Sequence, residues 1–172
     1  MIDISSLPTI TIDLVQCKHP AEIKGLMKAM GITRYCYAFI HNTIVMKYGQ
    51  SSDNDWIRGS YGERIYRQAG FIPGWPNARA PGSAGDDMLD VIPHFKNPNK
   101  NNVSIKIWDM TNYPFAVASD PKHELTQVED QLIDNYVQTY GYTPVGNIRE
   151  EKHIRTKTRV HDSLFNSIFE VE

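Results

Sequence analysis

The sequence predicts one α+β domain over residues 1–172, with a small antiparallel sheet of three strands, flanking helices, and an extension at each end. The first observation is composition: the 172 residues are 41% hydrophobic and 22% charged, typical of one globular domain rather than a disordered or fibrous chain. The second is a pair of short alternating runs joined by a polar connection, which indicates a hairpin. The third is a long segment with the apolar period of a helix.

The hairpin is predicted from Arg34–His41 and Ile44–Tyr48, which surround the short polar connection His41-Asn42-Thr43. The length of the connection decides which side chains share a face, because a shift of one residue turns every side chain over. A three-residue loop places Tyr37 opposite Lys47, whereas a two-residue loop sends them to opposite faces. We predict the three-residue loop.

A short helix is expected next. Ser60 followed three positions later by Glu63 forms a capping-box pattern, so the helix should run from about Tyr61 to Ala69 and end at Gly70.

A long insertion follows, over about residues 71–102. Its first part, Phe71–Gly85, is rich in proline and glycine and predicts a long loop, which is either functional or a passive insertion. Within it, Trp75 and Arg79 are candidate binding residues. Asp86–Phe95 predicts a short helix interrupted near Pro93.

A third strand is predicted at Val103–Ile107, and a long helix follows it. Asp120 as N-cap, Pro121 at the first helical position and Gly141 after the last turn bound this helix. Its apolar stripe consists of Leu125, Val128, Leu132, Ile133, Tyr136, Val137 and Tyr140.

Glu129 interrupts that stripe near the centre of the face expected to be buried. A carboxylate there costs free energy unless something pairs with it. One interpretation is a buried ion pair or a stripe that lies partly in a cleft. The other is a metal ligand or a catalytic acid.

Several classes of protein are disfavoured. Cys17 and Cys36 are the only two cysteines, and the six histidines lack metal-ligand spacing, which argues against disulfide frameworks and zinc enzymes. No apolar run could span a membrane and no secretory signal begins the chain, so we expect a cytoplasmic protein without a membrane partner. The net charge of −2 gives no hint of a nucleic-acid partner at the level of the whole chain.

The order of these elements, β-β-α-β-α, resembles the core of the GIY-YIG nucleases. The two segments that name the family correspond to Tyr35-Cys36-Tyr37 and Lys47-Tyr48-Gly49. Gly62–Gln68 is similar to the family's next helix, which carries an arginine in its first turn, here Arg64.

The resemblance continues in the long helix and covers about residues 34–147. Glu129-Asp130-Gln131-Leu132-Ile133 resembles the segment with the family's metal-binding glutamate, and Asn147 resembles the asparagine that closes the motif. Two positions depart from the pattern: Lys47 stands where most members have a second tyrosine, and Gln68 where many have histidine or tyrosine. The lysine and the insertion at 71–102 are similar to a subgroup of type II restriction endonucleases.

The resemblance implies a role for each residue. Glu129 would bind one Mg²⁺ or Mn²⁺, and Arg64 would contact the scissile phosphate. Tyr37 would accept a proton from the attacking water, with Lys47 lowering its pKa or relaying its proton. Asn147 completes the catalytic set.

Each of these residues also has a structural interpretation. Tyr37 could be core packing, Lys47 an exposed strand residue, Arg64 a partner in a surface ion pair and Asn147 a turn residue. Their combination in the family's order favours the nuclease.

The extension at 148–172 lies beyond the family core. Its basic stretch and three residues nearer the start are candidate DNA contacts: Gln68, Trp75, Arg79, Arg149, Lys152, Arg155, Lys157 and Arg159. A solvated charged face is the alternative for the basic stretch. Its apolar residues could dock on the core or on another subunit: Leu164, Phe165, Ile168 and Phe169.

The sequence therefore predicts a metal-dependent endonuclease acting on double-stranded DNA, most similar to a site-specific type II restriction enzyme. A homodimer on DNA is expected, because two-fold symmetry uses one reading surface twice, and a cognate DNA methyltransferase is a possible partner. Two alternatives stay open: a phage or mobile-element GIY-YIG nuclease of loose specificity, and a catalytically inactive nucleic-acid-binding domain.

Overall fold

The computed structural model describes residues 1–52, 61–77 and 79–148. Its strands are β1 (Thr9–Asp13), β2 (Arg34–His41), β3 (Ile44–Ser52) and β4 (Val103–Asp109). Its α-helices are α1 (Ala21–Ala29), α2 (Glu63–Ala69), α3 (Met88–Val91) and α4 (Lys122–Tyr140). Four 3-10 turns complete it: η1 (Ile4–Ser6), η2 (Leu14–Gln16), η3 (Ile92–His94) and η4 (Val145–Asn147).

The sheet has four strands in the order β1-β4-β2-β3, and every neighbouring pair is antiparallel. The prediction of an α+β fold with an antiparallel sheet is confirmed, but the prediction of three strands is wrong. The additional strand, β1, pairs with β4 over its whole length. Its sequence Thr9-Ile10-Thr11-Ile12 alternates β-branched polar and apolar residues, a strand signal that the three-strand prediction left out.

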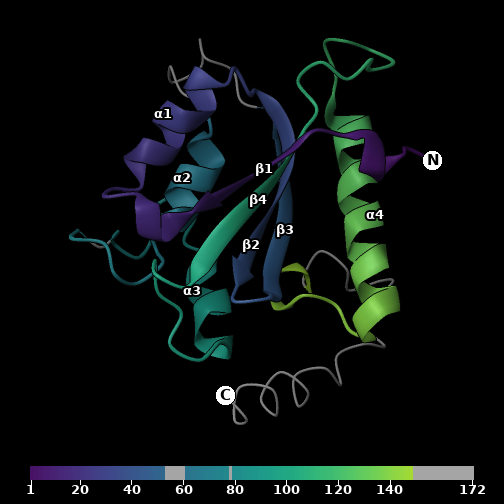
Figure 1. The fold of residues 1–172 in the computed structure, drawn as a ribbon. Helices are drawn as coiled ribbons and strands as arrows, with labels where there is room; N and C mark the ends of the chain where they lie inside the picture. Colours follow the sequence, from purple (N-terminus) through teal and green to yellow (C-terminus); the bar gives the residue numbers. More distant parts are fainter. Residues whose placement is uncertain (53–60, 78, 149–172) are drawn as a thin grey trace.

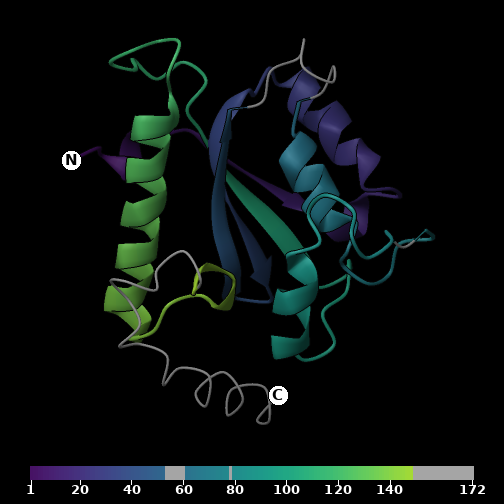
Figure 2. The same ribbon diagram turned by 180° about the vertical axis from the view of Figure 1, so that it is seen from behind.

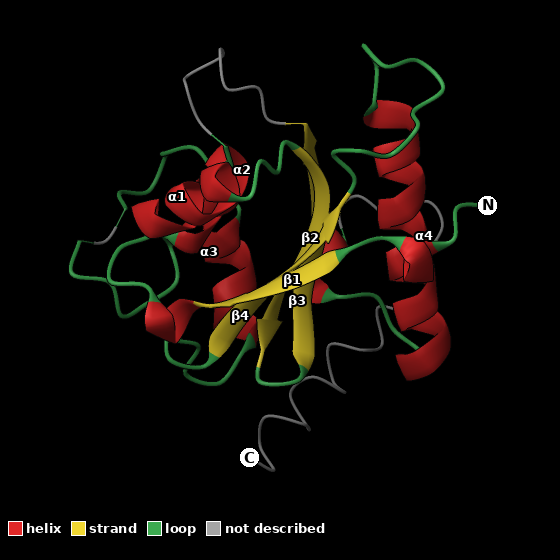
Figure 3. Ribbon diagram, turned by 45° about the horizontal axis from the view of Figure 1, so that its top comes forward, coloured by secondary structure: helices red, strands yellow, loops and turns green. Residues whose placement is uncertain are grey.

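Helices cover both faces of the sheet (Figures 1 and 2). Helix α4 lies alone on one side, whereas α1, α2 and α3 lie on the other, as the rotated view also shows (Figure 3). Neighbouring residues of β2 contact opposite layers, as the pleat requires. The Cys36 thiol donates to the Leu125 carbonyl oxygen on α4, and the Tyr37 hydroxyl donates to Gln68 on α2.

The hairpin register differs from the predicted one. The connection has two residues, Asn42 and Thr43, since His41 pairs with Ile44, and Tyr37 lies opposite Gly49 instead of Lys47. A β-bulge between Phe39 and Ile40 then shifts the pairing, so that Phe39 faces Lys47. An extra residue in one strand reverses the faces beyond it. Tyr37 and Lys47 therefore share one face, as predicted, through a bulge and not through the loop.

Two helix boundaries also differ. Helix α2 starts at Glu63 after Gly62, whose φ of 65° is left-handed, and the proposed cap Ser60 lies outside the described residues. The long helix starts at Lys122, one residue after the predicted Pro121, and no side chain caps its first turn. Its predicted end is confirmed: Gly141 adopts a φ of 82° as the C-cap.

The apolar stripe of α4 is buried from Leu125 to Tyr136, which fixes this helix on its face of the sheet. Tyr140, predicted as part of the stripe, is 52% exposed. Among the described residues, no helix is both long and apolar enough to cross a membrane.

The insertion contains little regular structure. Its first part, from Phe71 to Gly85, has no helix or strand at the positions that the structure describes, as predicted. The expected interrupted helix appears as α3 followed by the 3-10 turn η3, which contains Pro93.

Candidate active site

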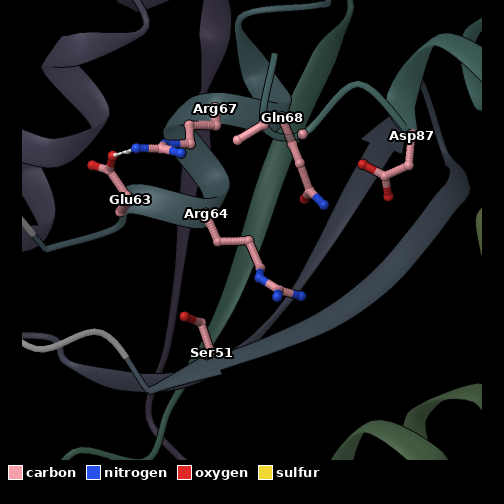
Figure 4. Close-up of a pocket in the computed structure, with 8 residues that line it drawn as sticks. Ser51, Glu63, Arg64, Arg67, Gln68 and Asp87 are labelled. Carbon is pink, nitrogen blue, oxygen red and sulfur yellow. Dashed lines mark hydrogen bonds and ion pairs between the residues drawn. The ribbon is translucent and has the colours of Figure 1, made fainter. Parts of the chain in front are cut away.

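A polar pocket with a volume of about 420 Å³ lies between α2, the end of β3 and the segment before α3. It is lined by Ser51, Glu63, Arg64, Arg67, Gln68, Ala84, Gly85 and Asp87. Figure 4 shows the polar ends of Arg64, Gln68 and Asp87 turned toward one another, while Arg67 is turned away toward Glu63.

The two arginines of the pocket differ in their partners. Arg67 is held by Glu63, with its Nη2 2.6 Å from Glu63 Oε1, and Lys24 approaches the same carboxylate at 3.2 Å. Arg64 is exposed and makes no hydrogen bond or ion pair with any residue in the described part of the chain. Its guanidinium, which has five donors in a planar fork, is therefore directed into the pocket without a described acceptor.

Tyr37 lies in the core beside this pocket. Its side chain is fully buried, and its hydroxyl donates to Gln68 Oε1 at 2.7 Å. The ring occupies the space that a side chain at position 49 would fill, because a Cβ added to Gly49 would lie 2.4 Å from Tyr37 Cζ. Gly49 is thus required for the Tyr37 ring to lie across β3.

Burial raises the pKa of Tyr37 well above its usual value. The guanidinium of Arg64 acts in the opposite direction, the carboxylates of Glu129 and Asp87 raise the pKa further, and the hydrogen bond to Gln68 lowers it. Two other predicted site residues, Arg64 and Glu129, therefore lie within electrostatic range of Tyr37. The direction of the shift nevertheless opposes the predicted role of Tyr37 as a base, since the hydroxyl stays protonated near neutral pH.

Lys47 is buried, with 4% of its surface exposed, and its Nζ lies 3.0 Å from Asp87 Oδ2. The interpretation of Lys47 as an exposed strand residue is therefore wrong. Asp87 was not predicted as a site residue. The local sequence Asp86-Asp87 carries no signal of this contact, because only the tertiary structure brings the insertion beside β3.

The insertion supplies one wall of the pocket. Arg79 lies over the rings of Tyr66 and Phe71, each 5.6 Å from its guanidinium carbon, and its Nη2 donates to the Ala84 carbonyl oxygen at 3.3 Å. Gly85 passes close to α2, where a Cβ would lie 2.9 Å from the backbone carbon of Arg67. Arg79 thus attaches the loop to α2, which differs from its predicted role as a DNA contact.

Glu129 lies on α4, across the sheet from α2, and is half-buried. Its influence reaches two residues of β2, because its carboxylate adds to the burial that raises the pKa of Cys36 and also raises that of Tyr37. The buried carboxylate of this helix is a different one: Glu124 is 7% exposed and accepts from the Ala116 backbone nitrogen at 2.6 Å. Sequence periodicity indicated only Glu129.

Asn147 is fully buried in η4. Its Oδ1 accepts from the Tyr48 backbone nitrogen at 2.8 Å, and its Nδ2 donates to the Tyr48 carbonyl oxygen at 3.0 Å. The amide therefore pairs with the outer edge of β3 as a neighbouring strand would. This geometry gives Asn147 a positioning role and excludes the simpler interpretation as a turn residue.

Two of the candidate DNA contacts are core residues. Gln68 is 3% exposed and bonded to Tyr37. Trp75 is 8% exposed, and its Nε1 donates to the Ala69 carbonyl oxygen at 2.8 Å. The indole is therefore not available to DNA. The remaining candidates lie outside the described residues, as does the apolar tail: Arg149, Lys152, Arg155, Lys157, Arg159, Leu164, Phe165, Ile168 and Phe169.

Among the described residues, no group of three or more His, Cys, Asp or Glu side chains could hold a metal ion. A divalent cation would therefore depend on a sparse protein donor set. Mg²⁺ can bind with so few protein ligands, since it commonly binds through one or two carboxylates and takes its other ligands from water and substrate phosphates. Glu129 is half-buried and its carboxylate influences the pKa of Tyr37, but it lies on α4 and does not line the pocket that Arg64 enters.

Comparisons with protein-family models, curated proteins and solved structures find no match to this chain.

Proposed function

We propose that this chain is a metal-dependent endonuclease that hydrolyses phosphodiester bonds of double-stranded DNA, acting as a site-specific enzyme of the type II restriction kind. The observation that carries the proposal is Arg64. An exposed guanidinium directed into a polar pocket, with no described partner, is suited to a phosphate group.

The neighbours of Arg64 support the same function. Tyr37 and Gln68 form a buried, hydrogen-bonded pair beside the pocket, and the carboxylate of Glu129 acts on the same tyrosine. These are the residue types and the chain order in which the sequence resembles the GIY-YIG nucleases.

Each residue has a defined task in the proposed reaction. Arg64 orients the scissile phosphate and stabilises the negative charge that develops on it. A cation held by Glu129 would supply Lewis-acid chemistry at a phosphate oxygen. Tyr37, which stays neutral, holds the Gln68 amide at the pocket by its hydrogen bond. Tyr37 is therefore not the proton acceptor in this proposal; the proton of the attacking water passes to solvent, and the leaving 3′ oxygen takes a proton from solvent.

The burial of Tyr37 also agrees with a second candidate function, nucleic-acid binding without cleavage. A domain that binds nucleic acid without cutting it would need Arg64 but no proton acceptor, and the burial of Tyr37 agrees with this.

Incubation with supercoiled plasmid of known sequence distinguishes the two functions. With Mg²⁺ or Mn²⁺ we expect discrete linear fragments, and with EDTA none. A smear of fragments would indicate a nuclease of loose specificity. Intact plasmid in every buffer, together with binding in a gel-shift measurement, would contradict the nuclease proposal and support the binding domain.

Glu129→Gln tests the proposed metal ligand. We expect cleavage to fall below detection while the melting temperature and DNA affinity stay near wild type, because the amide keeps the shape but not the charge. Asp130→Asn, an exposed neighbour on α4, is the matched control and should cleave normally. Normal cleavage by Glu129→Gln would contradict the assignment, and a large loss of stability would instead indicate a structural ion pair.

A further inference from the structure

Lys47 is constrained along its whole length. Its stem lies against η4, where a Cβ added to Gly146 would be 2.3 Å from Lys47 Cβ, and Asn147 fixes η4 to the edge of β3. Its ammonium meets Asp87 at 3.0 Å. The carboxylate of Asp87 therefore fixes the ammonium end of the Lys47 side chain, and η4 already encloses the end next to the backbone.

Asp87 itself reaches Lys47 only because the insertion folds back onto α2. The contacts of Arg79 with Tyr66, Phe71 and Ala84, and the close approach of Gly85 to Arg67, hold this loop in place. The Asp87 side chain is 49% exposed and lines the pocket that Arg64 enters.

The charge of Asp87 is unfavourable for a pocket that binds a phosphate group. A carboxylate on the pocket wall repels an anion. Asp87 also neutralises the ammonium of Lys47, which is only 4% exposed, so the ion pair joins a buried cation to a half-exposed acid. The placement of the Lys47 ammonium beside the pocket would offset the repulsion between Asp87 and a bound phosphate group.

We propose that Asp87 is a positioning residue, which holds the ammonium of Lys47 beside the pocket so that it faces the bound phosphate group in a fixed place. This inference rests on the proposed nuclease function. It gives the insertion at 71–102 a function: the insertion places Asp87 next to Lys47 on β3, and it does not contact DNA through Trp75.

Asp87→Asn is the first test, with Asp86→Asn as the matched control. The Asp86 carboxylate accepts from the Gly82 backbone nitrogen within its own loop, and an asparagine keeps an acceptor there. For Asp87→Asn we expect kcat to fall about 10- to 100-fold, as displaced groups typically cause, with KM for DNA unchanged or lowered because a repelling charge is removed. Because Asp87→Asn removes the ion-pair partner of a buried ammonium, we expect its melting temperature to fall, and kcat is therefore measured well below the unfolding transition of the variant. Asp86→Asn should cleave normally.

Coupling to Lys47 separates positioning from a general effect on the loop. If Asp87 acts through Lys47, the double variant Asp87→Asn with Lys47→Met should cleave no more slowly than Lys47→Met alone. Additive losses, or a higher KM with unchanged kcat in Asp87→Asn, would overturn the proposal.

A measurement without cleavage keeps this inference separate from the nuclease function. Amine acetylation by acetic anhydride, read residue by residue by mass spectrometry, reports how accessible Lys47 is. We expect its labelling rate to rise several-fold in Asp87→Asn and to stay unchanged in Asp86→Asn. Equal labelling of Lys47 in wild type and Asp87→Asn would overturn the positioning role, whereas a wild type that fails to cut DNA but shows this labelling difference would contradict only the nuclease.

Discussion

Single residues of the site carry chemistry that their local sequence does not define. The motif position of Tyr37 implied a proton acceptor, but its environment makes it a neutral donor, because burial raises its pKa and Gln68 accepts its hydrogen bond. Arg64 and Arg67 are separated by three positions on one helix, yet Glu63 forms an ion pair with Arg67 and not with Arg64. Partners, and not residue type alone, therefore distinguish a side chain directed into the pocket from one held in an ion pair.

Replacement of Tyr37 by phenylalanine tests its positioning role. Loss of the hydroxyl leaves Gln68 Oε1 buried without its donor, so the free energy of unfolding should fall by about 1–3 kcal/mol, measured by urea denaturation. Cleavage should slow by less than about tenfold, since no proton transfer is removed. Tyr140→Phe, at an exposed site on α4, is the control. A loss of about 100-fold or more in kcat, together with loss of the increase in kcat as pH rises, would restore Tyr37 as the general base.

Among the strands and helices, the most consequential feature is the bulge between Phe39 and Ile40. A two-residue hairpin alone would place Tyr37 and Lys47 on opposite faces, and the bulge returns them to one face. The second feature is η4, which uses the Asn147 amide to occupy the outer edge of β3 and encloses Lys47.

Asn147→Asp should remove this attachment. The carboxylate still accepts from the Tyr48 nitrogen, but an oxygen now faces the Tyr48 carbonyl oxygen, where a donor is needed. We expect the free energy of unfolding at pH 7 to fall by about 2–4 kcal/mol in urea denaturation, because a buried charge and an unpaired acceptor are created. Asn135→Asp, exposed on α4, should stay near wild type. Full stability combined with lost cleavage would show instead that Asn147 takes part directly in the reaction.

Across the molecule, buried tyrosines couple folding to alkaline pH. Burial raises the pKa of Tyr48 to about 12, and it also raises the pKa values of Tyr37 and Tyr136. An unfolded tyrosine loses its proton near pH 10. Above that pH the folded state binds more protons than the unfolded state, so the free energy of unfolding must decrease as pH rises.

The predicted decrease is measurable by urea denaturation between pH 9 and pH 12. Each tyrosine that stays protonated in the fold contributes a slope of about 1.4 kcal/mol per pH unit above pH 10. Tyr48→Phe should flatten this slope. Equal slopes for wild type and Tyr48→Phe would contradict the assignment.

Local patterns in the amino-acid sequence were enough to predict several elements. The strand at Arg34–His41, the first five residues of β4 (Val103–Ile107), the end of the long helix at Gly141 and the loop character of Phe71–Gly85 follow from alternation, glycine conformation and turn residues. These signals operate between residues a few positions apart, so that a single sequence is enough to recognise them.

The composition of the site, in contrast, depends on contacts between distant parts of the chain. The contacts of Lys47 with Asp87, of Tyr37 with Gln68 and of Asn147 with β3 join residues 40, 31 and 99 positions apart. Their formation depends on the bulge and on the loop that Arg79 attaches to α2. The burial that raises the pKa of Tyr37, and so opposes its expected role, likewise depends on the tertiary structure. Hydrogen bonds, ion pairs and desolvation act over a few ångströms in space, and position along the chain does not reveal which groups come that close.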